Sequence, residues 1–323
     1  MEMHSKRLLS VVVPAFNEES VISISIQRIN LILKENEIDF EIIVCDDGST
    51  DRTLLECLSL PRDIPLRVIK LGRNSGHMNA IKAGLEASKG DFVVTIDADL
   101  QDPPEYIPDM FALMFTGLAS GCVEKLSRTP DVVQAFRSDR SVDTLAKRTG
   151  ARLYYYLIKK LTGIELIPHA ADFRIMNRNV VDKLLSLPEG RPVYRLLIPK
   201  LGFTIRSFPI TRAERFAGET KYTYRKMFAL AIDSVLSFTH KPLRIFAYFG
   251  IISSIVLLVL SILTLMAALF GTTVPGWASI ALLILSANAF IFAGIGLLGE
   301  YIGRIYELLL KHPTTNWHEI DQA

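Results

Sequence analysis

A regular alternation of apolar and amphipathic runs in the first hundred residues restricts this chain to the α/β class. Short, almost wholly apolar runs occur at SVVVPAF, FEIIVCD, RVIKL and DFVVTID. Helical patterns stand between them at Ser20 to about Glu35, in a short segment after Thr50, and at Gly76 to Ser88. Strands that are apolar throughout are typical of a parallel sheet covered by helices on both faces.

Acidic residues follow three of these four predicted strands. Glu18 and Glu19 come after the first strand and Asp46, Asp47 and Asp51 after the second. Ligands of such sheets bind at the carboxyl ends of the strands, so these side chains are expected at one edge. DDGSTD is also typical of a turn before a helix, with Ser49 or Thr50 as the cap and Asp51 near the helix dipole.

Asp97 and Asp99 follow the fourth strand, in DADLQDPPE. Residues two apart in an extended chain point to the same side, so the two carboxylates face one spot. Their mutual repulsion favours a cation between them, and the alternative is a solvated loop. Neither GxGxxG nor GxxxxGK[ST] follows any of these four strands. We therefore expect acids to bind the ribose and base of a nucleotide diphosphate and to hold Mg²⁺ or Mn²⁺.

Charge and cysteine content exclude several classes. The 36 Lys and Arg residues and 34 Asp and Glu residues give a net charge of +2, which does not predict a nucleic-acid partner. Cys45, Cys57 and Cys122 are scattered, which argues against a disulfide framework and a zinc site. The N-terminus is interpreted as a first strand, since it lacks a signal-peptide cleavage site.

Two long runs without charge stand near the C-terminus. They are the 25 residues Phe246–Phe270 and the 23 residues Trp277–Gly299. Each is long enough to cross about 30 Å of hydrocarbon as a helix, and the alternative is a pair of buried core helices. Lys241, Arg244, Arg304 and Lys311 flank the pair, which predicts that both ends are cytoplasmic. Apolar residues at helical spacing in 222–244 predict an interfacial amphipathic helix, or alternatively a packed core helix.

Several motifs resemble one enzyme family. VVVPAFNEE, CDDGSTD, RNSGHMNAIKAGL and DADLQDPPE resemble the inverting family 2 glycosyltransferases of GT-A fold. ADFRIMNR, RAERFAGETKY, SFTHKPLRI and GEYIGRIYE narrow the resemblance to polyprenyl-phosphate glycosyltransferases. That group includes bactoprenol glucosyltransferases, aminoarabinose-type undecaprenyl-phosphate transferases and dolichyl-phosphate mannose synthases.

The resemblance implies a set of site residues. Those matching the nucleotide-sugar site are Pro14, Phe16, Glu18, Asp46, Asp47 and Asp97. Those matching the metal site are Asp97, Asp99 and Gln101. Those matching the catalytic groups and the basic residues around the phosphates are Asp172, Arg137, Lys147, Arg215 and Lys221, with Arg148 as the rival of Lys147. RAERFAGETKY is alternatively a basic surface loop facing anionic lipid.

Three places in the sequence depart from the family pattern. The stretch TGLASGCVEKLSRTPDVVQAFRSDR is longer than usual and lacks the glycine before Arg137, which affects the role of that residue. Ala171 replaces the usual glycine before Asp172, and the tail HPTTNWHEIDQA differs from the usual ending.

The resemblance predicts sugar transfer from a nucleotide sugar to a polyprenyl phosphate, with inversion. UDP-sugars are favoured over GDP-mannose, and undecaprenyl phosphate is the favoured acceptor. The predicted domains are a GT-A domain at 1–221, the interfacial helix at 222–244, a two-span hairpin at 245–300 and a tail at 301–323. The predicted location is the bacterial cytoplasmic membrane, and tetramers are common among the resembling enzymes. The alternatives are a catalytically silent scaffold subunit and a polysaccharide synthase, although the QxxRW motif of synthases is absent.

Overall fold

The structure is a computed structural model of the 323-residue chain. It describes residues 7–116, 129–137, 170–187, 193–212, 276–309 and 317–320, and five isolated positions between 252 and 266. The chain divides into two compact units, of which the first comprises Met1–Lys221 and His312–Ala323 and the second Tyr222–Lys311.

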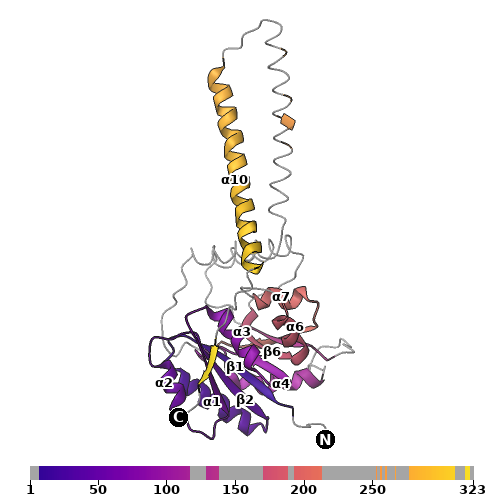
Figure 1. The fold of residues 1–323 in the computed structure, drawn as a ribbon. Coiled ribbons are helices and arrows are strands. Elements are labelled where there is room, and N and C mark those ends of the chain that lie inside the picture. Colours follow the sequence, from indigo (N-terminus) through magenta and orange to yellow (C-terminus); the bar gives the residue numbers. More distant parts are fainter. Residues whose placement is uncertain are drawn as a thin grey trace. The chain divides into compact units, whose positions relative to one another are not determined.

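An eight-stranded sheet forms the centre of the first unit (Figure 1). Its strands are β1 (Leu9–Ala15), β2 (Phe40–Asp46), β3 (Leu66–Leu71), β4 (Phe92–Thr95), β5 (Val132–Arg137), β6 (Ala170–Asn177), β7 (Ile205–Ile210) and β8 (Trp317–Ile320). They lie in the order β7-β5-β6-β4-β1-β2-β3-β8. The four predicted strands are the adjacent, parallel strands β1 to β4, which confirms the predicted α/β sheet.

The sheet is mixed rather than wholly parallel. β6 runs antiparallel to β4 and to β5, and β8 runs antiparallel to β3. Because β6 is reversed, its first residues lie beside the carboxyl end of β4, with Thr95 opposite Arg174. This reversal places the ADFR segment at the edge where the acidic strand ends meet.

Two groups of helices cover the sheet. One group is α1 (Ile22–Glu35), α2 (Thr53–Leu58), η1 (Pro104–Tyr106) and α4 (Ile107–Thr116). The other is α3 (His77–Ala87), α6 (Arg178–Leu185) and α7 (Tyr194–Lys200). Val11 and Val13 join the main hydrophobic core with Ile22 of α1, whereas Val12 lies against Gly84 of α3. Alternate β1 side chains therefore bury themselves under opposite helical layers.

The predicted C-terminal tail contributes a strand to this sheet. β8 pairs with β3, with Ile69 opposite Glu319. Arg67 of β3 donates two hydrogen bonds to the Glu319 carboxylate, at 2.7 and 3.0 Å. Trp317 donates from Nε1 to Glu86 Oε2 at 3.1 Å. These contacts cover the edge of β3, which would otherwise present unpaired backbone groups.

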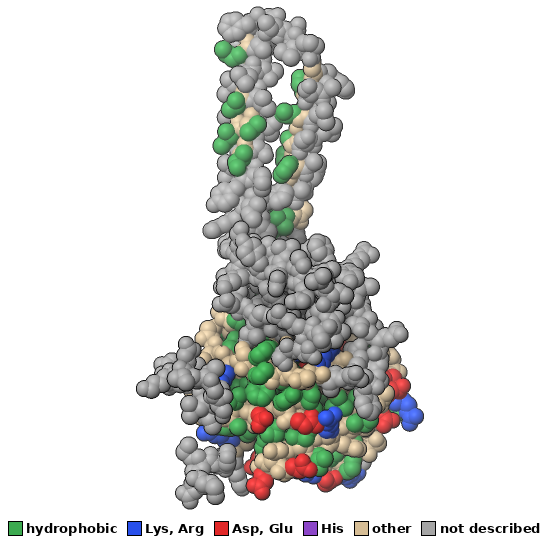
Figure 2. All heavy atoms as spheres, turned by 180° about the vertical axis from the view of Figure 1, so that it is seen from behind, with side chains coloured by type: hydrophobic (Ala, Val, Ile, Leu, Met, Phe, Trp, Pro, Cys, Tyr) green, Lys and Arg blue, Asp and Glu red, His purple; other side chains and the backbone are tan. Residues whose placement is uncertain are grey.

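In the second unit the structure describes the helix α10 (Trp277–Leu309), which includes the second predicted span. Its exposed side chains include Ile280, Ile284, Phe290 and Ile291. Figure 2 shows hydrophobic side chains on the surface of this unit. Almost all of the first predicted span, 246–270, and the whole predicted interfacial helix, 222–244, lie outside the described residues.

The predicted membrane location requires correction. In the described part of the chain, no helix combines the length and the apolarity that crossing a membrane requires. A span needs about 20 predominantly apolar residues in one helix. The prediction of a multi-pass protein of the cytoplasmic membrane, with both termini cytoplasmic, is therefore wrong by this criterion.

Candidate active site

The loops after β1 and β2 are joined by hydrogen bonds. Asn17, which has a positive φ of 57°, donates its backbone N–H to Ser49 Oγ at 3.0 Å. Its side-chain Oδ1 accepts from Thr50 N at 2.9 Å. At the start of α2 it is Asp51 that accepts from Thr53 N, at 2.9 Å. The expectation that Ser49 or Thr50 caps the helix is therefore wrong, because both bind the neighbouring loop.

Asp46 is the last residue of β2, and one oxygen of its buried carboxylate has no hydrogen-bond partner. Its Oδ1 accepts from Ser49 N at 3.0 Å, whereas the buried Oδ2 has no hydrogen-bond partner. An unpaired buried acceptor is costly, so a ligand N–H or O–H directed at Oδ2 would be favourable. Asp46 therefore has an unused hydrogen-bond acceptor, which a nucleotide-binding acid needs.

Asp47 has a different environment. Its two carboxylate oxygens accept from Ser75 N at 2.7 Å and Gly76 N at 2.9 Å. Burial raises the pKa of Asp47, and these two backbone bonds act against that rise. Asp47 therefore fixes the loop that leads into α3, in the motif RNSGHMNA.

Three further predicted nucleotide residues lie at the end of β1 or just beyond it. Pro14 is buried within β1, whereas the side chain of Phe16 is 42% exposed. Glu18 donates its backbone N–H to Thr53 Oγ1 at 2.8 Å. Phe16 thus offers an exposed aromatic ring at the carboxyl edge of the sheet, next to buried Asp46.

Asp97 and Asp99 lie in a tight turn after β4. Leu100 adopts a positive φ of 57°, and Gln101 N donates to Asp99 Oδ1 at 3.1 Å. Burial raises the pKa of Asp97 to about 6, opposed by His77 and reinforced by Asp172 and Asp99. The turn therefore concentrates negative charge that is not fully compensated within the protein.

The predicted metal residues fit a divalent cation only in part. No group of three or more His, Cys, Asp or Glu side chains in the described ranges is arranged as a complete metal site. The Gln101 Oε1 atom accepts a hydrogen bond from Arg212 Nη2. Mg²⁺, however, is commonly held by one or two carboxylates together with substrate phosphates. Burial, reinforced by the nearby Asp172 and Asp99 carboxylates, raises the pKa of Asp97. Such an environment fits a cation, which Asp97 and Asp99 would hold.

Asp172 lies beside this turn because Thr95 Oγ1 donates to its backbone carbonyl at 2.7 Å. His77 Nε2 lies 3.5 Å from Asp97 Oδ1 and 3.8 Å from Asp172 Oδ2, so it stands between the two carboxylates. Arg174 Nη2 lies 2.5 Å from Asp172 Oδ1, and Arg195 Nη2 lies 3.8 Å from the same atom.

The cations around Asp172 decide its ionisation. Burial by itself would raise the pKa of Asp172, but Arg174 and then Arg195 outweigh burial and hold the pKa below its usual value. The carboxyl group is therefore ionised at neutral pH. A carboxylate with a low pKa is a weak base, which favours orientation and charge stabilisation over proton abstraction.

Arg137 forms an ion pair that the sequence did not indicate. Its Nε and Nη2 atoms donate to the two oxygens of Asp102, at 3.0 and 2.9 Å. The Asp102 side chain is only 1% exposed, whereas that of Arg137 is 31% exposed. The pair places a guanidinium next to the Asp99 turn, so a contact of Arg137 with a substrate phosphate stays a prediction.

Three predicted basic residues cannot be located. Lys147, its rival Arg148, Arg215 and Lys221 lie outside the described residues. Conversely, the structure adds His77, Arg174 and Arg195 to the neighbourhood of Asp172. His77 and Arg174 belong to the motifs RNSGHMNAIKAGL and ADFRIMNR, so the sequence could have indicated them as site residues. Arg195 belongs to none of the quoted motifs.

Comparison with known structures gives the same fold. The glucosyl-3-phosphoglycerate synthase of Mycobacterium tuberculosis, solved with Mn²⁺, UDP-glucose and phosphoglyceric acid, superposes with a TM-score of 0.52 at 23% identity. The superposition covers 71% of this chain and 78% of that chain. Its likeness confirms the GT-A type of α/β fold.

Sequence relatives cover nearly the whole chain. The uncharacterized glycosyltransferase YkcC of Bacillus subtilis (strain 168) is 37% identical over 307 residues, 94% of this chain and 91% of the relative. The prophage bactoprenol glucosyl transferase homolog of Escherichia coli (strain K12) is 35% identical, over 94% of this chain and 96% of the relative. The bactoprenol glucosyl transferase of Shigella phage SfV is 36% identical, over 92% of this chain and 94% of the relative.

A family match locates the likeness on the sheet and its acidic edge. Residues 10–185 match the family Glycosyl transferase family 2. This range includes β1 except its first residue, β2 to β6, and all the described acids of the site. The resemblance that the motifs indicated is thus confirmed, and the chain belongs to glycosyl transferase family 2.

Proposed function

We propose that this glycosyltransferase moves a sugar from a nucleotide sugar to a polyprenyl phosphate, most simply undecaprenyl phosphate. Relatives named bactoprenol glucosyl transferases align with more than nine-tenths of this chain, which supports the acceptor class. The single structural observation that carries the proposal is the cluster at the carboxyl edge of the sheet. There the unpaired Asp46 Oδ2 and the raised pKa of Asp97 both favour a polar, partly cationic ligand.

The nucleotide is proposed to bind at the ends of β1 and β2. Asp46 Oδ2 would accept a hydrogen bond from the base or ribose, and the exposed ring of Phe16 would lie against the base. Glu18 lies on the same loop, which Thr53 holds in place. Asp47 acts indirectly, since its carboxylate already holds Ser75 and Gly76. We favour a UDP-sugar over GDP-mannose as the donor.

The diphosphate is proposed to lie over Asp97 and Asp99, with Gln101 next to them. Mg²⁺ or Mn²⁺ bound to these carboxylates would neutralise negative charge on the departing nucleoside diphosphate. The mycobacterial structure of the same fold contains Mn²⁺ and UDP-glucose, which makes this pair the first to test. His77 lies between Asp97, which is proposed to bind the metal of the donor, and Asp172, which is proposed to lie at the sugar.

The transfer itself requires little proton chemistry. A phosphate monoester carries roughly 1.5 to 2 negative charges near neutral pH and is already nucleophilic. An acceptor oxygen forms the bond to the anomeric carbon, and the bond from that carbon to the diphosphate breaks on the opposite face, which inverts the configuration. The electron pair leaves with the nucleoside diphosphate. The ionised Asp172 would stabilise positive charge that develops on the sugar.

Product identification tests this function. Purified protein would be incubated with a panel of UDP-sugars and GDP-mannose, with undecaprenyl phosphate in detergent, and with Mn²⁺ or Mg²⁺. We expect one sugar to appear on the lipid phosphate, with release of the nucleoside diphosphate and an inverted anomeric centre. Transfer to a growing glycan instead would indicate a synthase. Absence of transfer with every donor, from folded protein, would indicate a silent scaffold subunit.

A further inference from the structure

A small group of basic side chains surrounds the carboxylate of Asp172. Arg174 and Arg195 both approach its Oδ1 atom, at 2.5 and 3.8 Å, whereas His77 approaches Oδ2 at 3.8 Å. The three residues belong to β6, α7 and α3, so packing of separate elements brings them together. One carboxylate oxygen therefore faces two guanidinium groups that come from separate elements.

Arg174 is the buried member of this group. Its side chain is 2% exposed, and its Nε and Nη1 atoms have no hydrogen-bond partner. Burial lowers the pKa of Arg174, and the charge of Arg195 acts in the same direction, against the attraction of Asp172. A buried guanidinium that is only partly satisfied is costly. An additional anion near the cluster would reduce this cost.

Arg195 is the accessible member. Its side chain is 40% exposed, and its 3.8 Å approach to Asp172 is longer than a hydrogen bond. The guanidinium therefore keeps donors for an external oxyanion, to which arginine binds in a forked geometry. Since Arg174 already binds the shared oxygen at 2.5 Å, Arg195 can turn toward a ligand without leaving Asp172 unpaired.

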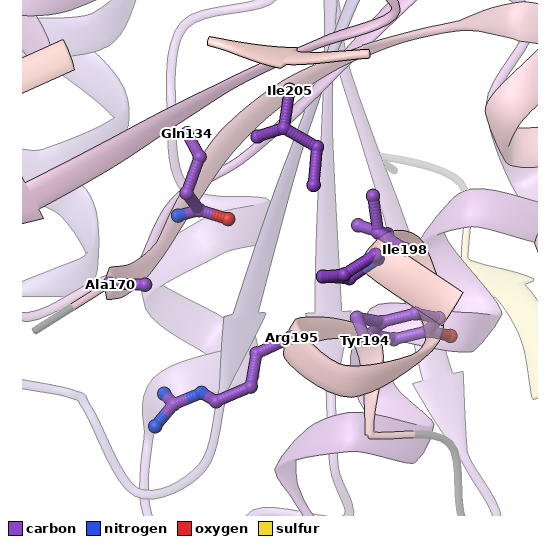
Figure 3. A pocket seen from close by; sticks show the side chains of 7 residues that line it. Gln134, Ala170, Tyr194, Arg195, Ile198 and Ile205 are labelled. Carbon is purple, nitrogen blue, oxygen red and sulfur yellow. The ribbon is translucent and has the colours of Figure 1, made fainter. Parts of the chain in front are cut away.

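The cavity beside Arg195 is too small to hold the ligand. It is lined by Gln134, Tyr194, Arg195 and neighbouring apolar side chains, and its volume is about 20 Å³ (Figure 3). Such a volume holds about one water molecule and is too small for a sugar ring. Gln134 Nε2 donates to Ala171 O at 2.7 Å and Phe173 O at 3.1 Å, which fixes β6 on this side. An anion would therefore bind on the exposed side of Arg195.

We propose that Arg195 binds the phosphate of the acceptor lipid, while Arg174 acts as a positioning residue that holds Asp172. The inference rests on the proposed function and adds a residue of the acceptor site. The acceptor is favoured over the donor diphosphate because Asp172 Oδ2 faces His77, which also lies beside Asp97, whereas Oδ1 faces Arg195. A phosphate monoester offers the negative charge and the paired oxygens that the exposed Arg195 guanidinium can bind.

The test separates the two phosphates by their kinetic constants. In Arg195→Gln we expect the KM for farnesyl phosphate, a water-soluble acceptor, to rise about tenfold or more, with the KM for the nucleotide sugar within twofold of the original. Arg195→Lys should recover part of the loss, because lysine restores the charge but not the fork. Lys200→Gln removes one charge from the same short helix and should leave both constants unchanged.

A binding measurement makes the result independent of turnover. Farnesyl phosphate titrated into the protein with UDP and Mn²⁺ should bind at least about tenfold more weakly to Arg195→Gln, at an unchanged Tm. Equal acceptor binding and equal acceptor KM in the variant would overturn the assignment. A rise in the donor KM alone would place Arg195 at the diphosphate and overturn it as well. Acceptor binding that depends on Arg195 in a protein without transferase activity would instead refute only the proposed function.

Discussion

The chemistry at the residue scale depends on how few partners the acidic side chains have. Asp47 and Asp102 are fully engaged, by Ser75 and Gly76 and by Arg137 respectively. Asp46 keeps an unpaired oxygen, and Asp97 keeps a raised pKa. The first pair of residues therefore builds the site, and the second pair is available to ligands.

Replacing Asp99 tests the metal assignment. Asp99→Asn keeps the size of the side chain but removes the charge, so turnover with Mg²⁺ or Mn²⁺ should fall at least about 100-fold. The Tm should not fall, because the substitution relieves repulsion with Asp97. Asp109→Asn, on an exposed position of α4, is the control and should be fully active. Full activity of Asp99→Asn over a metal titration would rule out this role.

Replacing Asp102 tests whether its pair with Arg137 is structural. Asp102→Asn weakens two hydrogen bonds to a guanidinium at a buried position, so we expect the free energy of unfolding in urea to fall by about 1–3 kcal/mol. Glu105→Gln weakens the exposed pair with Arg28 and should change stability little. Equal stability of Asp102→Asn and the original protein would contradict a structural role.

Local patterns predicted part of the elements, and long-range contacts decided the rest. Short apolar runs predicted β1 to β4, and the helical patterns between them predicted α1 to α3. Both kinds of pattern can be recognised because each is contained within one short segment. β8 was missed, since HPTTNWHEIDQA has no strong strand pattern and becomes a strand only by pairing with β3. Arg195 was missed for the same reason, since its neighbour Asp172 is 23 positions away and on another element.

The packing of α3 on the sheet predicts one glycine effect. A Cβ atom at Gly84 would overlap Val12 Cγ1 and would lie 2.6 Å from Cys45 Sγ, both within buried strands. Gly84→Ala should therefore lower the free energy of unfolding by about 1–3 kcal/mol, despite the better helix propensity of alanine. The double variant with Gly84→Ala and Val12→Ala should lose less free energy of unfolding than the two single variants lose in sum, because the smaller Val12→Ala side chain makes room for the added methyl group. A more stable Gly84→Ala protein would disprove the tight packing.

The attachment of β8 should depend on pH. The hydrogen bonds from Arg67 hold the pKa of Glu319 below its usual value. Because the folded-state pKa of Glu319 is lowered, its carboxylate stabilises the folded protein at pH values above the ordinary pKa of about 4.3. This stabilisation is lost as the pH falls through the folded-state pKa. In a Trp277→Phe background, Trp317 fluorescence should therefore change below about pH 4.

The control for this pH effect is Glu319→Gln. This variant lacks the titrating group that faces Arg67, so Trp317 should report weaker attachment of β8 already at pH 7 and a smaller change on acidification. Glu86, which accepts from Trp317, is unchanged in both proteins. Identical pH profiles of the two proteins would show that Glu319 does not hold the strand.

At the scale of the whole molecule, the second unit is an insertion within the first. The chain leaves the sheet after β7, forms the unit Tyr222–Lys311 and returns through β8. The sequence indicated the GT-A domain and its acidic edge, because both lie in continuous motifs. It did not indicate that the last residues return to the sheet, because strand pairing across 250 positions leaves no local pattern.

The most direct test of the whole account is the binding of UDP by calorimetry, with and without Mn²⁺. We expect UDP to bind in Mn²⁺ and to lose at least about tenfold in affinity in EDTA, with the same loss in Asp97→Asn even when Mn²⁺ is present. UDP affinity that is identical in Mn²⁺ and EDTA, or unchanged by Asp97→Asn, would contradict a nucleotide diphosphate site at the acidic edge of the sheet.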